Sequence, residues 1–218
     1  MNNTVQSSMA SRWIGGIVPF GVSWSKLMMW IFLLTDAFTF GTFLTSYGFF
    51  RFRSEVWPDP EVVFQSFPLI ADHGLPLVFV GLMTFILIAS SLTMVLAVEA
   101  GHRNDRRTVI KYLVLTIVGG IAFLACQAYE WTHLIHGGMT LSHNPFGDPI
   151  FGQLFFTITG FHGFHVFSGV VINAVMLRKS QKGNFERKGS YEAVEIAGLY
   201  WHFVDLVWVF VFTLFYLI

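Results

Sequence analysis

Five long apolar stretches constrain the fold of this chain more than any other feature. They cover about residues 26–49, 75–100, 112–136, 150–177 and 191–218. Each is long enough to cross a bilayer as a helix, which takes roughly 20 apolar residues. Of the 218 residues 54% are hydrophobic and 12% are charged, a composition far from that of soluble domains. The sequence therefore predicts an all-α integral membrane protein, a bundle of five transmembrane helices.

Basic residues are distributed unevenly among the segments that join these stretches. All but two of the 13 fall on one predicted side: Arg12, Lys26, Arg103, Arg106, Arg107, Lys111, Arg178, Lys179, Lys182, Arg187 and Lys188. The other side has Arg51 and Arg53. Because segments rich in Lys and Arg stay in the cytoplasm, the pattern predicts a cytoplasmic N-terminus and a C-terminus outside. The formal net charge of zero argues against a nucleic-acid partner.

The segments outside the spans indicate a single membrane domain. We expect residues 1–25 to form an N-terminal cytoplasmic segment, without a cleaved signal peptide, and residues 26–218 to form the five-helix domain. The longest connection, residues 50–74, lies on the outer side. Pro58, Pro60 and Pro68 oppose regular helix there, so we expect an irregular loop.

Ionisable residues inside the spans are the main candidates for function. At a rise of about 1.5 Å per residue, five lie near the middle of their spans: Asp36, His162, His165, His202 and Asp205. A charge at the bilayer centre costs about 2.5–3.5 kcal/mol on insertion scales, so such groups face the bundle interior and pair. Burial favours the protonated form of Asp36, which has no basic residue within a helical turn.

A second polar group lies nearer the outer end of the third span. Glu130 and His133 are three residues apart, a spacing that puts both side chains on one helix face. Glu130 is a second buried carboxylate by position.

Three functions are compatible with these residues taken alone. Two histidines three residues apart, as in GFHGFHV, can ligate a metal or a haem iron, with His162 or His165 opposite His202. Asp36, His202 and Asp205 can form a proton or ion relay of a transporter, although no proline interrupts a helix core as broken-helix transporters require.

In the third interpretation the same groups join helices. Gly160, Gly163 and Gly169 permit close backbone approach, and the histidines of the same span form hydrogen bonds across the contacts. Spacing alone does not decide among metal ligation, ion relay and helix packing.

Four motifs resemble one known family, in the same order along the chain. YWHFVDLVWVFVF at 200–212 is similar to the last helix of subunit III of the haem–copper respiratory oxidases, and FFTITGFHGFHVFSG at 155–169 to the helix before it. CQAYEW at 126–131 and WIFLLTDAFTFGTF at 30–43 resemble two further helices of that family. The nearest rivals are an accessory protein of nitric oxide reductase and a stand-alone haem-binding membrane protein.

The resemblance implies an accessory subunit of a terminal oxidase that reduces oxygen to water while moving protons. Haem and copper would belong to partner subunits, so it implies neither a cofactor nor a metal nor a catalytic residue in this chain. It implies packing on subunit I beside subunit II and other subunits, support of proton uptake, and a multi-pass location in the bacterial cytoplasmic membrane. The electron donor, cytochrome c or a quinol, binds elsewhere.

The resemblance also assigns roles to individual residues. Asp36 stands where the family usually has Glu, and with Glu130 it would be a buried, proton-related carboxylate. Arg178 would hold the head group of a structural phospholipid at the cytoplasmic end of the fourth span. The remaining candidates would form a polar network between helices: His133, His162, His165, His202 and Asp205. Long family members have seven helices and this chain resembles the last five, so another subunit would complete the lipid cleft, or the cleft would be open.

Overall fold

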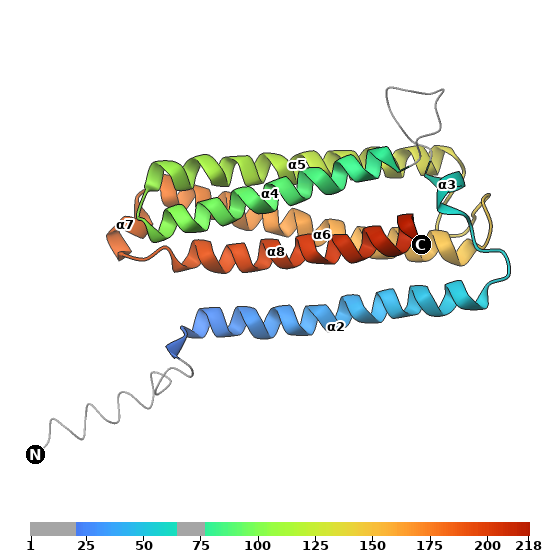
Figure 1. Cartoon of the computed structure of the whole chain (residues 1–218), viewed down its shortest axis with the longest axis horizontal. Helices are drawn as coiled ribbons and strands as arrows, with labels where there is room; N and C mark the ends of the chain where they lie inside the picture. Colours follow the sequence, from blue (N-terminus) through green and yellow to red (C-terminus); the bar gives the residue numbers. More distant parts are fainter. Residues whose placement is uncertain (1–20, 65–76) are drawn as a thin grey trace, which may run out of the picture.

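The computed structural model describes residues 21–64 and 77–218, and within these ranges it contains helices and no strand. The helices are α2 (Trp24–Arg53), α3 (Pro60–Val63), α4 (Val78–His102), α5 (Arg106–His136), α6 (Pro149–Gln181), α7 (Asn184–Lys188) and α8 (Glu192–Phe212). A π-helical turn, Thr213–Leu217, continues α8. Five helices of the described ranges are long and apolar enough to cross a membrane, which confirms the predicted all-α fold with five spans (Figure 1).

Most of the helices are longer than the apolar stretches that predicted them. α2 continues to Arg53, whereas the first apolar stretch ends at residue 49. α5 begins at Arg106, whereas the third stretch begins at residue 112. An apolar run measures the hydrocarbon core, whereas the helix continues through the interface, where basic side chains reach water. Asp105 caps α5 by accepting hydrogen bonds from the backbone N–H and hydroxyl of Thr108. These hydrogen bonds lower the pKa of Asp105 below its ordinary value.

The outer connection is more regular than predicted. Residues 60–63 form the short helix α3, which begins at Pro60. The expectation of an irregular loop is wrong here, because proline fits the first turn of a helix, where its missing N–H has no intrahelical partner. Pro68 and the end of this connection lie outside the described residues, as do residues 1–20 of the predicted N-terminal segment.

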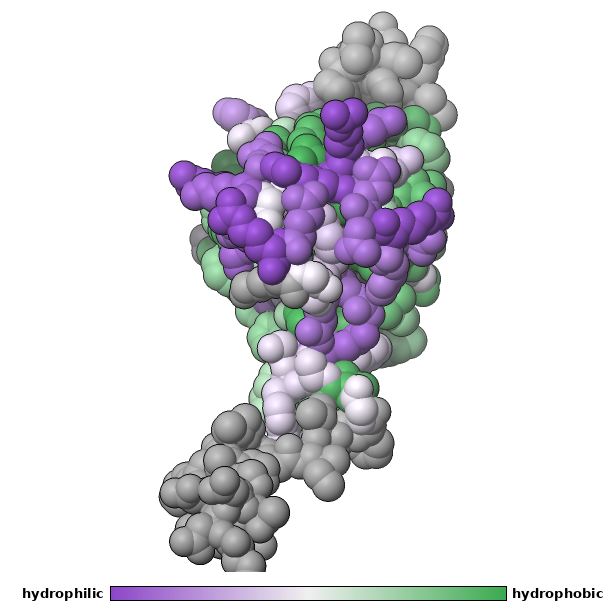
Figure 2. Space-filling model, turned by 90° about the vertical axis from the view of Figure 1, so that its left-hand side faces the viewer, coloured by the Kyte–Doolittle hydropathy of each residue, from purple (hydrophilic) through white to green (hydrophobic). Residues whose placement is uncertain are grey.

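The spanning helices run roughly parallel to one another, and α2 lies along α6 and α8 at the edge of the bundle (Figure 1). The described chain begins at the α7 end of the bundle and finishes at the opposite end. Figure 2 shows hydrophilic side chains gathered over the α7 end. We call this end, where α7 and the α4–α5 turn lie, the polar end. That it faces the cytoplasm remains a prediction.

An indole ring joins four helices in the middle of the bundle. Trp201 of α8 is 1% exposed and lies between two glycines. A Cβ at Gly120 of α5 would lie 2.6 Å from Trp201, and a Cβ at Gly169 of α6 would lie 2.8 Å from it. The indole N–H donates to the Ser90 hydroxyl of α4 at 3.2 Å. Gly169 thus permits the predicted close approach, whereas a Cβ at Gly163 would meet nothing within 4 Å.

Candidate functional site

Asp36 and His165 form an acid–histidine pair between α2 and α6. His165 Nε2 lies 3.3 Å from Asp36 Oδ2, and the two residues are 7% and 8% exposed. The rings of Phe40 and Phe161 flank the imidazole, with centroids 5.3 and 4.6 Å away. Aromatic rings therefore flank the imidazole, and both residues of the pair are buried.

The hydrogen bonds of His165 restrict where protons lie in this pair. Its Nδ1 is 2.9 Å from the carbonyl oxygen of Phe161, and a carbonyl oxygen only accepts, so Nδ1 carries a hydrogen. Nε2 then faces Asp36 either as an acceptor or, in the imidazolium, as a donor. An ionised Asp36 beside a neutral His165 would leave two acceptors facing each other. A proton on either Nε2 or the carboxyl group would remove this conflict, and at 3.3 Å the two atoms are in contact without a hydrogen bond that meets geometric criteria.

His162 has a different environment, although it is three residues from His165. It is 0% exposed, and neither ring nitrogen has a hydrogen-bond partner among the described residues. Its ring stacks on Trp208 at 5.3 Å and meets the edge of Phe123 at 5.8 Å. His162 is thus an aromatic packing element between α5, α6 and α8.

Glu130 of α5 is 0% exposed and anchors the far end of the bundle. Its Oε2 accepts from Gln127 Nε2 at 3.0 Å and from the Tyr216 hydroxyl at 2.9 Å. Tyr216 belongs to the π-helical turn after α8, so this contact ties the end of α8 to α5. The structure does not bring His133 into the cluster, because its side chain is exposed.

His202 and Asp205 converge on one hydroxyl group of α4. The Ser91 hydroxyl lies 2.6 Å from His202 Nδ1, and Asp205 lies three residues after His202 on α8, a spacing that puts both side chains on one helix face. Asp205 Oδ1 is buried and has no hydrogen-bond partner among the described residues. The three groups form a continuous polar cluster between α4 and α8.

The candidate metal and lipid groups lie apart from one another. Within residues 21–64 and 77–218, no three His, Cys, Asp or Glu side chains are placed to hold one metal ion. Among the three candidate histidines, His165 faces Asp36, His162 packs on Trp208 and His202 bonds Ser91, so their side chains lie in separate contacts. Arg178, in the last turn of α6, is exposed at the polar end.

Sequence reasoning missed the partners in these clusters more than the ionisable residues themselves. Ser91 comes from the run ASSLT inside the second span, where adjacent small hydroxyl residues could have signalled a helix contact. Tyr216 is one of several aromatic residues near the C-terminus, and nothing local distinguishes it. The partnership of Asp36 with His165 depends on which helices are neighbours, which the sequence does not state.

These features define a multi-pass helical membrane protein whose interior ionisable side chains are held between helices. The family model described as cytochrome c oxidase subunit III matches residues 14–218. The chain therefore belongs to the cytochrome c oxidase subunit III family, whose members are accessory subunits of haem–copper respiratory oxidases.

Several relatives have similar sequences over most of their length. The cytochrome c oxidase subunit 3 of Synechocystis sp. is 37% identical over 189 residues, covering 86% of this chain and 73% of the relative. The subunit of the same name from Alkalihalophilus pseudofirmus is 35% identical, covering 88% and 85%. The quinol oxidase subunit 3 of Bacillus subtilis is 30% identical, also covering 88% and 85%. Membership of the family implies a complex with other oxidase subunits.

Proposed function

We propose that this chain is the cofactor-free accessory subunit of a proton-pumping terminal oxidase that reduces oxygen to water in a bacterial cytoplasmic membrane. It packs directly on subunit I, beside subunit II and the other subunits, and the haem and copper belong to those partners. The observation that carries the proposal is that the buried ionisable side chains of this chain contact its other helices. Asp36, Glu130 and His202 each bond a side chain of another element of this chain, which fits a structural role in the bundle.

Support of proton uptake is the second part of the proposal. A proton held between Asp36 and His165 would lie beside α2, the spanning helix with the smallest buried share. A partner helix packed against α2 would lie close to this proton. Such a position suits a group that tunes the field along a proton path in subunit I without carrying electrons.

Lipid binding is the third part, and it concerns the polar end. The exposed guanidinium of Arg178 can make bidentate, charge-assisted hydrogen bonds to a phosphate while its stem remains in the apolar layer. We propose that it holds a structural phospholipid head group. The cleft beside it is completed by another subunit or is open to the bilayer.

The rival functions receive less support from the contacts. A stand-alone haem protein needs opposed ligands, and His162 and His202 belong to separate clusters. The relatives quoted above are named as cytochrome c and quinol oxidase subunits, which favours an oxidase over nitric oxide reductase. Because both names occur, the donor remains open between cytochrome c and a quinol.

A deletion strain tests this assignment. The oxidase purified without this chain should retain its haem and copper spectrum and its initial turnover rate, while activity decays faster during sustained turnover. The chain purified alone should show no Soret band and no stoichiometric iron or copper. A Soret band that disappears in His162→Ala or His202→Ala would establish the haem-binding alternative.

The proposed orientation is tested by cysteine labelling. In a Cys126→Ala background, a cysteine placed between residues 178 and 190 should react with an impermeant reagent from the cytoplasm. A cysteine added after Ile218 should react from outside. The reverse pattern would contradict the cytoplasmic N-terminus and the assignment of residues 1–25 to the cytoplasm.

A further inference from the structure

Two adjoining cavities lie between the end of α4 and the beginning of α8. The first, about 240 Å³, opens at the polar end and is lined by Asn104, Ser190 and Glu192 among others. The second, about 260 Å³, runs between Val95 of α4 and Leu199 of α8 and reaches His202. The two share Val98, His102 and Glu195 in their walls. We call the combined space the α4–α8 groove.

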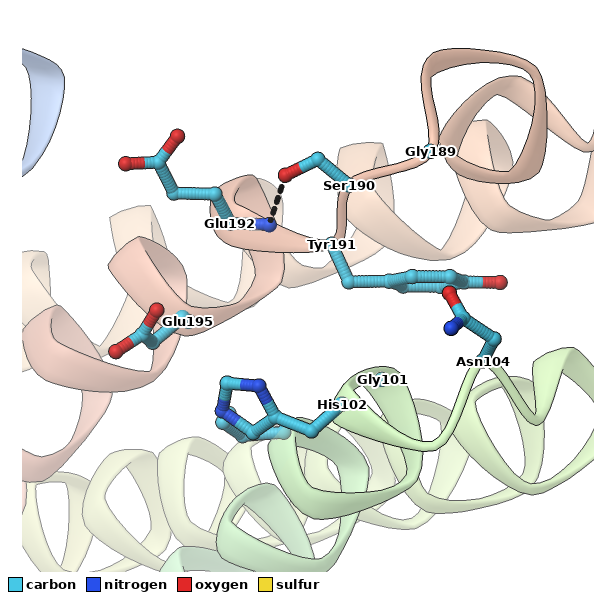
Figure 3. Close-up of a pocket in the computed structure, with 9 residues that line it drawn as sticks. Gly101, His102, Asn104, Gly189, Ser190, Tyr191, Glu192 and Glu195 are labelled. Carbon is cyan, nitrogen blue, oxygen red and sulfur yellow. Dashed lines mark hydrogen bonds between the residues drawn. The ribbon is translucent and has the colours of Figure 1, made fainter. Parts of the chain in front are cut away.

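Figure 3 shows how the mouth of this groove is built. The His102 ring, at the end of α4, lies across from the first turn of α8, which carries Glu192 and Glu195. The Tyr191 ring extends beside Gly101 and Asn104. Ionisable side chains from both helices therefore stand at the entrance.

The charged groups at the mouth have partners that hold them in place. Lys26 of α2 pairs with Glu195. Within α4, Glu99 pairs with Arg103 at 2.8 Å. Glu192 accepts a hydrogen bond from Ser23. The contacts of Lys26 and Ser23 join the beginning of α2 to α8, the Glu99–Arg103 pair lies within α4, and the groove between α4 and α8 remains a cavity.

At its inner end the groove meets the polar cluster of His202, Ser91 and Asp205. His202 lines the groove and lies ten residues after Glu192, about 15 Å along the helix and so near the middle of a bilayer core of roughly 30 Å. Because Nδ1 is 2.6 Å from Ser91, Nε2 is the nitrogen left for a proton from the groove. Beyond Ser91 lies Asp205, whose Oδ1 has no partner among the described residues.

We propose that the α4–α8 groove is a proton-access path from the polar end of the bundle to Asp205. A proton from bulk water adds to Nε2 of neutral His202. The hydrogen on Nδ1 then passes to the Ser91 oxygen as the Ser91 hydroxyl hydrogen passes to the Asp205 carboxylate. One proton enters at Nε2 and one arrives on Asp205, which leaves His202 neutral with its hydrogen on Nε2, and a flip of the imidazole ring then turns this N–H toward Ser91 and the bare nitrogen toward the groove.

The sealed acid–histidine pair provides the contrast that motivates this inference. Asp36 and His165 are flanked by Phe40 and Phe161, and no cavity described above includes either residue. A group that serves only to join helices gains nothing from a cavity that leads to it, whereas an exchangeable proton requires one. The inference deepens the proposed support of proton uptake and depends on that proposal for the eventual use of the proton.

Hydrogen–deuterium exchange of Asp205 tests the path directly. In the purified complex that contains this chain, the infrared C=O band of Asp205 is assigned by its loss in Asp205→Asn. We expect the band to shift soon after transfer to D₂O. Val95→Phe should narrow the groove and slow the shift by about tenfold, equivalent to a barrier roughly 1.4 kcal/mol higher. Val95 is 48% exposed, so the larger ring has room without disturbing the core.

Matched variants separate the path from general perturbation. Leu92→Phe lies one turn away on α4 at a residue 60% exposed and outside the groove lining, so it should exchange like wild type. Ser91→Ala should slow exchange by breaking the relay, and Ser91→Thr should restore it by returning a hydroxyl. If Asp205 is ionised at neutral pH, lowering the pH must bring up its C=O band with the same dependence on these variants.

The result that overturns the proposal is equally specific. No shift in D₂O over hours, or an equal shift rate in wild type and Val95→Phe, would show that the groove is not the path. Failure of the C=O band to form at low pH would do the same. Because the band reports this chain's own carboxyl group, the outcome does not depend on turnover. A complex that lacks oxidase subunits would contradict the proposed function instead.

Discussion

The two acid–histidine clusters of this bundle have similar chemistry and different access to solvent. Asp36 and His165 face each other in a buried position where Phe40 and Phe161 flank the imidazole. His202 and Asp205 share Ser91 at the inner end of the α4–α8 groove. Both clusters lie in the middle portion of their helices. We refer to them as the sealed pair and the open cluster.

The difference teaches that residue type and spacing do not decide what surrounds a buried ionisable group. His162 and His165 repeat the spacing of His202 and Asp205, yet His162 packs against aromatic rings without a hydrogen bond among the described residues. In each case the side chains of the neighbouring helices determine which contacts the histidine makes. Changes to the sealed pair should therefore affect assembly, and changes at the open cluster or the polar end should affect function with less effect on assembly.

The largest effect is expected for Asp36→Lys. A lysine there would place an ammonium group beside His165 in an apolar wall, and a charge at the bilayer centre costs about 2.5–3.5 kcal/mol even on insertion scales. The amount of this chain recovered with the oxidase should fall severely. Quantitative immunodetection of the purified complex measures the loss.

Asp36→Asn is the matched control for that variant. An asparagine amide can donate to Nε2 of neutral His165, whose Nδ1–H still donates to the Phe161 carbonyl oxygen. Assembly should then stay close to wild type. If Asn is as damaging as Lys, the carboxyl group is ionised and paired with an imidazolium, and the sealed pair is a charged site.

A smaller loss is expected for Tyr216→Phe at the far end of the bundle. The variant removes one of two hydrogen bonds to Glu130 Oε2, and leaving a buried polar group short of a partner costs about 1–3 kcal/mol. The melting temperature of the complex or of the chain in detergent should drop. Tyr129→Phe, at a residue 39% exposed, should leave it unchanged, and equal effects of the two would contradict the role of Glu130.

Sequence reasoning predicted the helices because their signal is continuous and physical. Each apolar stretch is long enough to span a bilayer, and five spans in the described ranges agree with that count. The predicted ends of the helices are less accurate, as at Arg53 and Arg106. Hydropathy marks where the chain leaves the apolar layer, whereas the helix continues to its last hydrogen-bonded turn. Pro60 predicts irregular backbone by residue type, although the first turn of a helix accepts proline.

The sequence predicts which ionisable residues are buried, but it does not predict which side chains they contact. Asp36, Glu130, His162 and His165 are all buried, as the cost of polar groups in lipid requires. Their partners could not be derived, since pairing depends on helix rotation and order. His133 shows the limit of a spacing argument, because it lies three residues from Glu130 and is nevertheless exposed.

A moderate effect on stability is expected for Ser91→Ala in the open cluster. His202 would lose its hydrogen-bond partner on α4, and a typical intramolecular hydrogen bond contributes about 0.5–1.5 kcal/mol. The complex should assemble in normal yield with a slightly lower melting temperature. Loss of assembly comparable to Asp36→Lys would mean that the open cluster is as structural as the sealed pair, and the distinction between them would fail.

The smallest effect on assembly is expected for Arg178→Ala, which changes only the exposed polar end. The arginine side chain is exposed in the last turn of α6, so its removal leaves the bundle interior intact. If its guanidinium holds a phospholipid phosphate, the variant should keep the oxidase spectrum and initial rate while activity decays faster and less phospholipid co-purifies. Arg178→Lys should be intermediate, because lysine retains the charge and loses the planar fork.

Lys179→Ala is the internal control for Arg178→Ala. It removes the neighbouring exposed charge of the same turn, so a general effect of net charge would appear equally in both variants. A phosphate site at Arg178 should make Arg178→Ala the more damaging, in lipid content and in lifetime under turnover. Equal behaviour of the two, with full lipid content, would leave Arg178 as one of several basic residues that set orientation. The basic residues of the polar end would then serve only to orient the chain in the membrane. Any functional role of the open cluster would depend on the α4–α8 groove.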